Sequence, residues 1–211
     1  SDLGDPYPLE TIFFGGGTPS LTSIEHFLRA LEPLELAKRI GPDTEWTAEC
    51  NPSSVTPDKI SFFKQIGINR ISLGVQSTHS RFLNSMGRVH SDADVDRALE
   101  ILFSTGMSNV SVDLLCGIPD QSLEDLTASL EHLTRYPINH LSCYLLTLSK
   151  GHPLFKQLPS ENEQLDHLML IDQFMTSKEF EHYEISNFAK PGKQAKHNLN
   201  YWTGGSYLGL G

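Results

Sequence analysis

The stretch that decides the fold is Thr11-Ile12-Phe13-Phe14-Gly15-Gly16-Gly17-Thr18-Pro19-Ser20, in which a short apolar run ends in three glycines. Adjacent glycines cost backbone entropy, so we expect them where a turn needs positive φ or a ligand approaches the main chain. Thr22 and Glu25 have capping-box spacing, which predicts a helix start. A strand, a glycine loop and a helix start often hold a polar ligand. A plain turn is the alternative, because the loop matches neither of the common glycine-rich phosphate-binding motifs.

The composition indicates a globular protein without a nucleic-acid surface. The chain has 211 residues, with 38% hydrophobic and 20% charged residues, which is ordinary for a folded domain. The net charge is −10, whereas nucleic-acid binding normally requires a basic patch. Because no apolar stretch is long enough to span a bilayer, we expect no integral membrane segment.

The cysteines indicate a reducing compartment. Cys50, Cys116 and Cys143 are odd in number, lie far apart and form no C-x-x-C motif. Such spacing argues against a secreted disulfide framework. We therefore expect three buried thiols in a cytoplasmic protein.

Strand-like and helical segments alternate five times over the first 150 residues, which predicts a parallel sheet with crossover helices. The expected strands are Thr11–Gly15, Glu45–Asn51, Arg70–Gln76, Asn109–Cys116 and His140–Leu146. The expected helices cover roughly 23–40, with a kink or restart at Pro33, then 57–66, 91–106 and a segment opening at Ser122, and a turn is expected at 41–43.

Polar residues alternate with apolar ones along three of these strands. Strands covered by helices on both faces should instead be almost continuously apolar. The pattern therefore predicts a sheet curled into a barrel or half-barrel, with helices outside and a polar lumen. Glu49, Gln76 and Asp113 lie at or towards the carboxyl ends of neighbouring strands, where such folds bind ligands. Each alone could be a solvated edge residue, but together they favour a site.

The pattern changes after residue 150, and we place a domain boundary there. Residues 1–150 are expected to form a partial barrel, and residues 151–211 the start of an α+β C-terminal region. Ser160 and Glu163 make a second capping box that opens a helix. A strand-like piece, His182–Phe188, follows it.

Six strings of the chain follow one another in order: Phe14–Ser20, Glu49–Pro52, Arg70–Ser77, Val112–Pro119, Tyr183–Ala189 and His197-Asn198-x-x-Tyr201-Trp202. Taken together, they resemble the coproporphyrinogen-oxidase-like branch of the radical S-adenosyl-L-methionine (SAM) proteins. The later strings are similar to the heme-chaperone subgroup of that branch. The resemblance implies a partial (β/α) barrel with five of six βα units present, a [4Fe-4S] cluster and SAM at the open end.

One departure from the family concerns the cluster loop. The family motif C-x-x-x-C-x-x-C, expected upstream of Thr11, is absent, and the three cysteines present are not spaced to hold a cluster. The resemblance therefore implies a fragment, truncated at both ends, with no metal ligand in this chain. The cluster cysteines are expected upstream of Ser1, in the full-length protein only. A natural cluster-free relative is the alternative.

The resemblance assigns the methionine part of SAM to the glycine loop. Gly16, Gly17 and Thr18 are expected to receive it, with Thr18 adding a hydroxyl. Arg88 is the expected partner of the SAM carboxylate, because a guanidinium matches a carboxylate bidentately.

The remaining expected SAM contacts lie on the strands. Glu49, Gln76 and Asp113 are expected to hydrogen-bond the ammonium, ribose and adenine edges. Thr147, at the end of the fifth predicted strand, is expected to add a contact.

The string that contains His197 offers a second ligand site. Histidine supplies a neutral nitrogen to iron near neutral pH, and Tyr201 and Trp202 supply flat apolar surface for a porphyrin. We expect Asn198 to orient the imidazole, as residues behind a metal ligand do. The alternative is a structural aromatic cluster that packs the appendage on the barrel.

Three functions remain open from the sequence. The first is a heme chaperone that binds heme and transfers it to an unidentified acceptor protein, with a [4Fe-4S] cluster and SAM as cofactors. The second is an oxygen-independent coproporphyrinogen III oxidase of porphyrin biosynthesis, and the third is an inert fragment. The expected partners are heme or porphyrin and no nucleic acid, and peripheral membrane association stays open.

Overall fold

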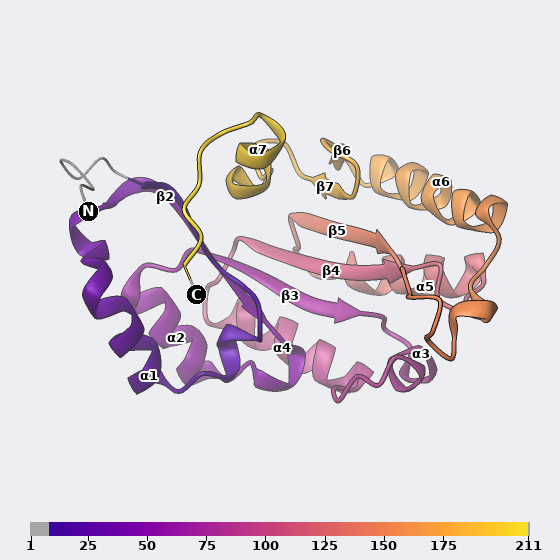
Figure 1. The fold of residues 1–211 in the computed structure, drawn as a ribbon, viewed down its shortest axis with the longest axis horizontal. Helices are drawn as coiled ribbons and strands as arrows, with labels where there is room; N and C mark the ends of the chain where they lie inside the picture. Colours follow the sequence, from indigo (N-terminus) through magenta and orange to yellow (C-terminus); the bar gives the residue numbers. More distant parts are fainter. Residues whose placement is uncertain (1–8, 211) are drawn as a thin grey trace.

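The computed structural model describes residues 9–210, which form a curled sheet with helices on its outer face (Figure 1). The strand order is β1-β2-β3-β4-β5-β7-β6. The first five strands pair in parallel, β7 is antiparallel to β5, and β6 is antiparallel to β7. The predicted partial (β/α) barrel is confirmed. The strands are β1 (Leu9–Phe14), β2 (Ile40–Cys50), β3 (Arg70–Gln76), β4 (Val110–Cys116), β5 (His140–Leu145), β6 (Glu181–His182) and β7 (Asn187–Ala189).

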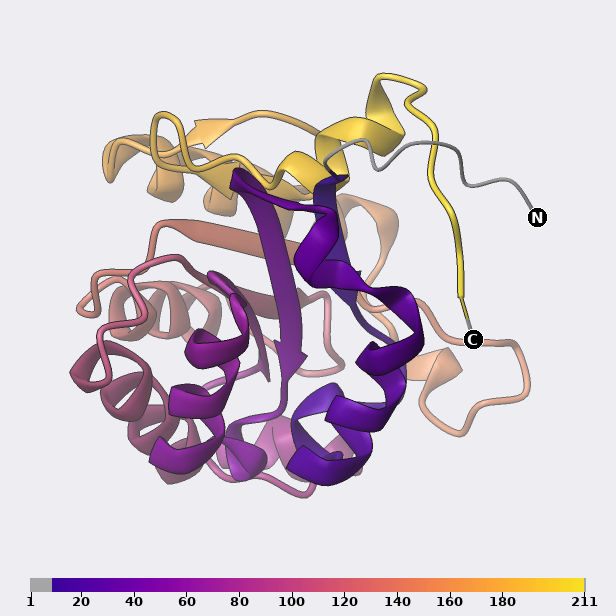
Figure 2. The same cartoon turned by 90° about the vertical axis from the view of Figure 1, so that its left-hand side faces the viewer.

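Helices fill each connection between the parallel strands and lie outside the curled sheet (Figure 2). The sixth helix packs beside the fifth, and the seventh lies against β1. The helices are α1 (Ile24–Leu31), α2 (Pro57–Ile66), α3 (Ser80–Ser85), α4 (Asp92–Ser104), α5 (Leu123–Leu133), α6 (Glu161–Ser177) and α7 (Lys196–Trp202).

The two faces of the sheet differ as the alternating pattern predicts. Trp46, Leu73 and Val112 are at most 2% exposed and belong to one hydrophobic core beneath the helices. Ser72 and Asp113, one residue away from Leu73 and Val112, lie on the opposite face of the same strands. Large apolar side chains are buried on just one face of the sheet, beneath the helices. The inner face is therefore polar, and we call the space that it borders the lumen.

The start of α1 differs from the prediction. The N-cap is Ser23, whose hydroxyl accepts the His26 N–H at 3.2 Å. Thr22 instead ends a short 3₁₀ helix, Pro19–Leu21, which follows the glycine loop. The predicted capping box of Thr22 and Glu25 is therefore wrong, because Thr22 closes the 3₁₀ turn through its N–H bond to the Pro19 carbonyl and the N-cap of α1 lies one residue later. The second capping box, at Ser160, is confirmed.

The segment after α1 also differs. The predicted helix over 23–40 ends at Leu31 and continues as two 3₁₀ helices, 32–34 and 36–38, separated by Glu35 at φ 45°. A left-handed residue cannot continue an α-helix, so the proline region ends it rather than kinking it. The predicted turn at 41–43 lies inside β2, where the β1–β2 register shifts.

Residues beyond 150 add strands to the same sheet. The predicted strand His182–Phe188 is instead two short strands, β6 and β7, because the chain turns between them and Tyr183 N–H bonds back to the Asn187 carbonyl at 3.2 Å. Strand β7 then pairs with β5 through Leu141↔Phe188. The division into units at residue 150 stays a prediction, since a shared sheet does not show whether either part folds alone.

Replacing Gly67 by alanine should lower the free energy of unfolding by about 1–2 kcal/mol, the cost of a left-handed non-glycine residue. Gly67 ends α2 at φ 105°, and an added Cβ would lie 3.3 Å from the ring of buried Trp46. Urea unfolding tests this, with Gly151→Ala as the control because its Cβ would enter open space. Equal stability of the two variants would contradict this account of the turn.

Candidate functional site

A cavity of about 210 Å³ opens in the lumen near the carboxyl ends of β2 and β3, and Asp113 of β4 also lines it. Six of the eight residues expected to contact SAM line it, from five separate parts of the chain. The lining residues are Gly16, Thr18, Glu49, Cys50, Asn51, Ser72, Gly74, Gln76, Arg88 and Asp113.

The glycine loop closes one wall of this cavity. Gly16 has φ 101°, and its N–H donates to the Glu49 carboxylate at 3.0 Å. A Cβ at Gly15 would lie 2.6 Å from the Phe13 ring and 3.0 Å from Glu49 Oε1, so a larger residue there would displace one of these two side chains. Thr18 is also left-handed, at φ 71°, which turns the chain back across the cavity.

Two carboxyl groups give the cavity its chemistry. Burial raises the pKa of Glu49, the Gly16 N–H partly offsets this, and the nearby Asp113 charge raises it further. Burial also raises the pKa of Asp113, and hydroxyl donors partly offset this rise. One of them, the Ser72 hydroxyl, lies 3.1 Å from Oδ1 and 3.0 Å from Oδ2 of Asp113. Carboxylates accept hydrogen bonds only, so the cavity suits a ligand with ammonium or hydroxyl donors.

The end of β3 shapes the opposite wall. Gln76 has φ 65°, and a Cβ at Gly74 would lie 3.1 Å from its amide nitrogen. Glycine at position 74 therefore leaves room for the Gln76 side chain beside the cavity. Arg88 is exposed and lies at the cavity from the segment after α3.

Two expected contacts do not line this cavity. Gly17 is exposed beside it, and Thr147 is exposed with its hydroxyl directed to the Leu145 carbonyl at 3.4 Å. Sequence reasoning left four lining residues out of the site. Asn51, Ser72 and Gly74 belong to the same alternating polar faces as the predicted contacts, so the alternation itself could have identified them. Cys50 belongs to the apolar alternation and carried no such signal.

The segment with the His197 string packs on β1 and β2, next to the cavity wall that the glycine loop forms. Helix α7 lies across these two strands (Figure 2). His197 Nδ1 is 2.9 Å from the Thr11 hydroxyl, and its ring stacks on Phe13 with centroids 4.8 Å apart. The Tyr201 ring meets the imidazole edge-on at 5.1 Å. The Glu45 carboxylate accepts a hydrogen bond from the backbone N–H of His197 at 3.1 Å.

The imidazole of His197 is held in its neutral form. Burial lowers its pKa, Glu45 opposes this effect, and Arg70 adds to it. Thr11, rather than Asn198, bonds the ring nitrogen, so the expected role of Asn198 is corrected; its side chain lies by the Tyr183 hydroxyl instead. Trp202 is 56% exposed on the same helix.

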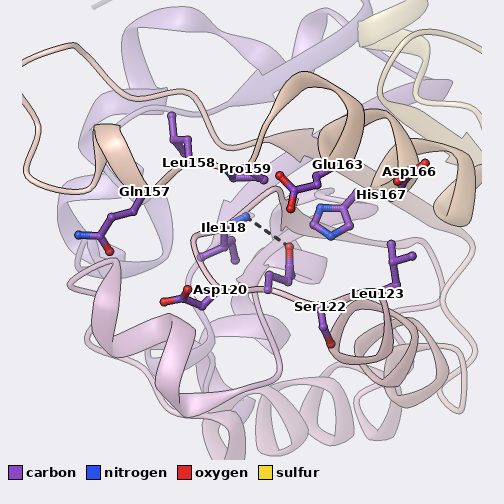
Figure 3. Close-up of a pocket in the computed structure, with 11 residues that line it drawn as sticks. Ile118, Asp120, Ser122, Leu123, Gln157, Leu158, Pro159, Glu163, Asp166 and His167 are labelled. Atoms are coloured by element: carbon purple, nitrogen blue, oxygen red, sulfur yellow. Dashed lines mark hydrogen bonds between the residues drawn. The ribbon is translucent and has the colours of Figure 1, made fainter.

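A second cavity, of about 390 Å³, lies between the loop after β4 and helix α6 (Figure 3). His167 forms its base, and its Nδ1 accepts the Gly117 N–H at 3.2 Å. Gln121 bonds the Ile118 N–H across the loop at 3.3 Å. None of the ligand contacts predicted from the sequence lines this cavity. Ile118 belongs to the string Val112–Pro119, but sequence reasoning assigned that string no role in a second site.

The three cysteines lie on separate strands, β2, β4 and β5, and all are buried. Burial raises the pKa of Cys50 to about 12, and contact with Cys116 raises that of Cys143. Within residues 9–210, no three His, Cys, Asp or Glu side chains are grouped to hold a metal ion. A [4Fe-4S] cluster, which needs closely placed thiolates, therefore does not fit the described residues.

The position predicted for the cluster cysteines is not covered by the structure. Ser1 and the seven residues after it lie outside the described range, which begins at Leu9. The assignment of the cluster loop to a segment upstream of Ser1 therefore stays a prediction. The first predicted unit begins at Ser1, so its first eight residues also lie outside the described range.

A buried histidine makes stability sensitive to acid. His140 is fully buried between the Ser111 and Tyr183 hydroxyls, each 2.7 Å away. Burial, assisted by Arg70, lowers its pKa well below 6.5. His140 therefore takes up a proton in the unfolded chain at a pH where it stays neutral in the folded chain. The free energy of unfolding falls as the pH drops below the pKa of histidine in the unfolded chain.

We expect His140 to remove up to about 1.4 kcal/mol of stability per pH unit below about pH 6.5. Urea unfolding of wild type and His140→Gln at a series of pH values between neutrality and mild acid measures the difference in slope. The slope should be shallower in the variant. Identical slopes would show that His140 protonates in the folded protein as readily as in the unfolded chain.

Comparisons with known proteins agree with this fold and site. Residues 2–133 match the Radical SAM superfamily, and the chain belongs to that family. It is 37% identical over 207 residues to "Heme chaperone HemW" of Escherichia coli K12, covering 96% of this chain and 54% of that protein. It is 38% identical over 210 residues to mouse "Radical S-adenosyl methionine domain-containing protein 1, mitochondrial", covering 96% and 48%. The predicted resemblance is confirmed.

A solved structure supports the architecture. Coproporphyrinogen III oxidase (HemN) of Escherichia coli matches with a TM-score of 0.77 and 22% identity, over 92% of this chain and 46% of that one. At this identity the match shows the fold alone. The chain spans about half the length of the curated relatives it matches. Within the part that the structure describes, none of the helices has the length and apolar character to cross a membrane.

Proposed function

We propose that the protein binds heme and passes it to an acceptor protein, with SAM bound in the lumen cavity. The observation that carries this proposal is the environment of His197, whose ring is fixed by Thr11 and flanked by the aromatic rings of Phe13 and Tyr201. Similarity to proteins named heme chaperones supports it.

The proposed heme site uses the chemistry of α7. A neutral imidazole can ligate iron, and a hydrogen bond to its other nitrogen sets the tautomer and the ring orientation. With Nδ1 bonded to Thr11, Nε2 is the nitrogen left for iron. Tyr201 and Trp202 are about half exposed and supply flat apolar surface for the porphyrin.

The proposed SAM site is the cavity at the carboxyl ends of the strands. Gly16 and Thr18 would hold the methionine part, and Arg88 its carboxylate. Glu49, Gln76 and Asp113 would bind the ammonium and the nucleoside. Gly17 and Thr147 remain proposed contacts at the edge of this site. The family's cluster supplies reducing chemistry when bound, and we derive no step through it because the described residues do not fit it.

The alternative function, coproporphyrinogen III oxidation, has less support. The match to that enzyme is one of fold, whereas the relatives that share more sequence identity are named heme chaperones. We further propose a cytoplasmic location, with peripheral membrane contact open, because three free buried thiols are typical of a reducing compartment. Fractionation of cells that express the protein would test this location.

A transfer assay tests the proposed function. The protein is loaded with one equivalent of heme, separated from free heme and mixed with a heme-free globin, and the globin spectrum is followed. Transfer from the loaded protein that is slower than that of free heme but goes to completion is expected of a chaperone. Failure to bind heme, or retention of heme in the presence of excess globin, would reject the proposal.

We expect that the 211-residue chain does not assemble a [4Fe-4S] cluster. Its cysteines are buried on three strands, and Cys50 is two strands away from the contacting pair Cys116 and Cys143. Anaerobic incubation with iron and sulfide, followed by a visible spectrum and an iron count, measures this. A stoichiometric iron content with a broad charge-transfer band would refute the expectation.

A further inference from the structure

A buried arginine in the lumen has no ion-pair partner among residues 9–210. Arg70, the first residue of β3, is 3% exposed, and its Nε has no hydrogen-bond partner. The contact found for its guanidinium is a long bond from one terminal nitrogen to the Thr47 hydroxyl, at 3.5 Å. A buried charge without a counterion is strongly unfavourable, because its lost hydration is not replaced.

Arg70 lies between the two proposed ligand sites. It is on the same face of β3 as Ser72 and Gln76, which line the SAM cavity further along the strand. In the sheet register Arg70 is paired with Thr47 of β2, and Thr47 with Phe13 of β1. The His197 ring stacks on Phe13, so the guanidinium lies in the same region of the lumen as the imidazole to which we assign the heme iron.

The carboxylates of the lumen already have other donors. Asp113 accepts the Ser72 hydroxyl with both oxygens. Glu45 accepts the backbone N–H groups of Lys196 and His197, at 3.2 and 3.1 Å. Among the described residues, neither carboxylate forms an ion pair with Arg70. The guanidinium thus keeps its donors for a carboxylate that arrives with a ligand.

We propose that Arg70 binds a propionate carboxylate of heme or porphyrin whose iron or ring centre lies at His197. This inference rests on the proposed heme-binding function and adds to it the group that recognises the ligand's acidic edge. A guanidinium matches a carboxylate with two parallel hydrogen bonds. Because Arg70 is 3% exposed, the proposal also requires the side chains that cover it to move when the ligand enters.

Comparing heme with its ester tests this in the wild-type protein, and two variants of Arg70 extend the test. Heme and its dimethyl ester, in the same detergent, are titrated separately into wild type, Arg70→Gln and Arg70→Lys, and the Soret band is followed. Arg97→Gln is the matched control, since Arg97 lies on outer helix α4 and pairs with Asp94. Circular dichroism and thermal melting establish that each variant is folded.

Wild type should bind the free acid about 10- to 100-fold more tightly than the ester, which is the loss expected for a hydrogen bond to a charged group. Arg70→Gln should bind both forms with the affinity of the wild type for the ester, Arg70→Lys should recover part of the preference, and Arg97→Gln should behave as wild type. Equal binding of acid and ester by wild type overturns the inference even if the variants fail to fold.

The remaining outcomes separate this inference from the proposed function. If Arg70→Gln weakens acid and ester equally, the residue is structural and the inference fails while heme binding stands. If Arg70→Gln lowers SAM affinity but leaves heme affinity unchanged, the guanidinium serves the SAM carboxylate instead. If wild type binds neither porphyrin, the proposed function and the inference both fail.

Discussion

Substitution of His197 by alanine is expected to weaken heme binding by roughly 100-fold, because loss of a residue behind a metal ligand already costs about 10- to 100-fold. The substitution removes the proposed axial nitrogen together with the Thr11 hydrogen bond and the Phe13 stacking contact. The Soret maximum should also move, because the iron loses its nitrogen ligand. A titration of each protein with heme, followed by absorbance, measures both effects.

The control for this experiment is His26→Ala, which removes an exposed histidine of α1. It should leave both the affinity and the spectrum unchanged. Equal affinity and identical spectra for wild type and a folded His197→Ala variant would show that α7 is held by a structural aromatic cluster. Thermal melting of the variant separates loss of ligation from loss of folding.

Glu49→Gln should reduce SAM binding by roughly 10- to 100-fold, because it removes a charged acceptor from a partly buried cavity. Wild-type binding itself should be weak, since no cluster iron is expected to chelate the methionine group in this chain. Asp113→Ala should also reduce it. Because the pKa values of both carboxyl groups are raised, SAM affinity should fall as the pH is lowered through the mildly acidic range.

Calorimetry measures this affinity, and Asp120→Asn is the matched control. Asp120 is an exposed carboxylate of the second cavity (Figure 3). Its substitution should not affect SAM binding. If Asp120→Asn weakened binding while Glu49→Gln and Asp113→Ala did not, the SAM site would lie in the second cavity, and the assignment from the sequence would be wrong.

The alternation along the strands was sufficient to predict the architecture. The strands alternate polar residues, such as Ser72 and Asp113, with apolar ones, such as Leu73 and Val112. This alternation requires one face covered by helices and one face towards the lumen, and the structure has both. The same alternation brings Glu49, Gln76 and Asp113 to one cavity, because carboxyl ends of parallel strands meet at one edge of the sheet.

Features that depend on tertiary contacts could not be predicted. The ring of His197 is oriented by Thr11, which is 186 residues earlier in the chain, and no local pattern links the two. Arg70 followed the polar alternation of β3, but its lack of a partner among the described residues is visible only once the neighbouring strands are placed. The second cavity depends on how α6 packs beside α5, which sequence periodicity does not specify.

The central claim is that one chain holds two ligands in neighbouring sites of the half-barrel lumen, heme at α7 and SAM at the carboxyl ends of the strands. The most direct measurement is the stoichiometry of heme binding in the presence of saturating SAM, with both bound ligands quantified by equilibrium dialysis. The account predicts one heme and one SAM on each chain, with unchanged heme affinity. Displacement of either ligand by the other would contradict it.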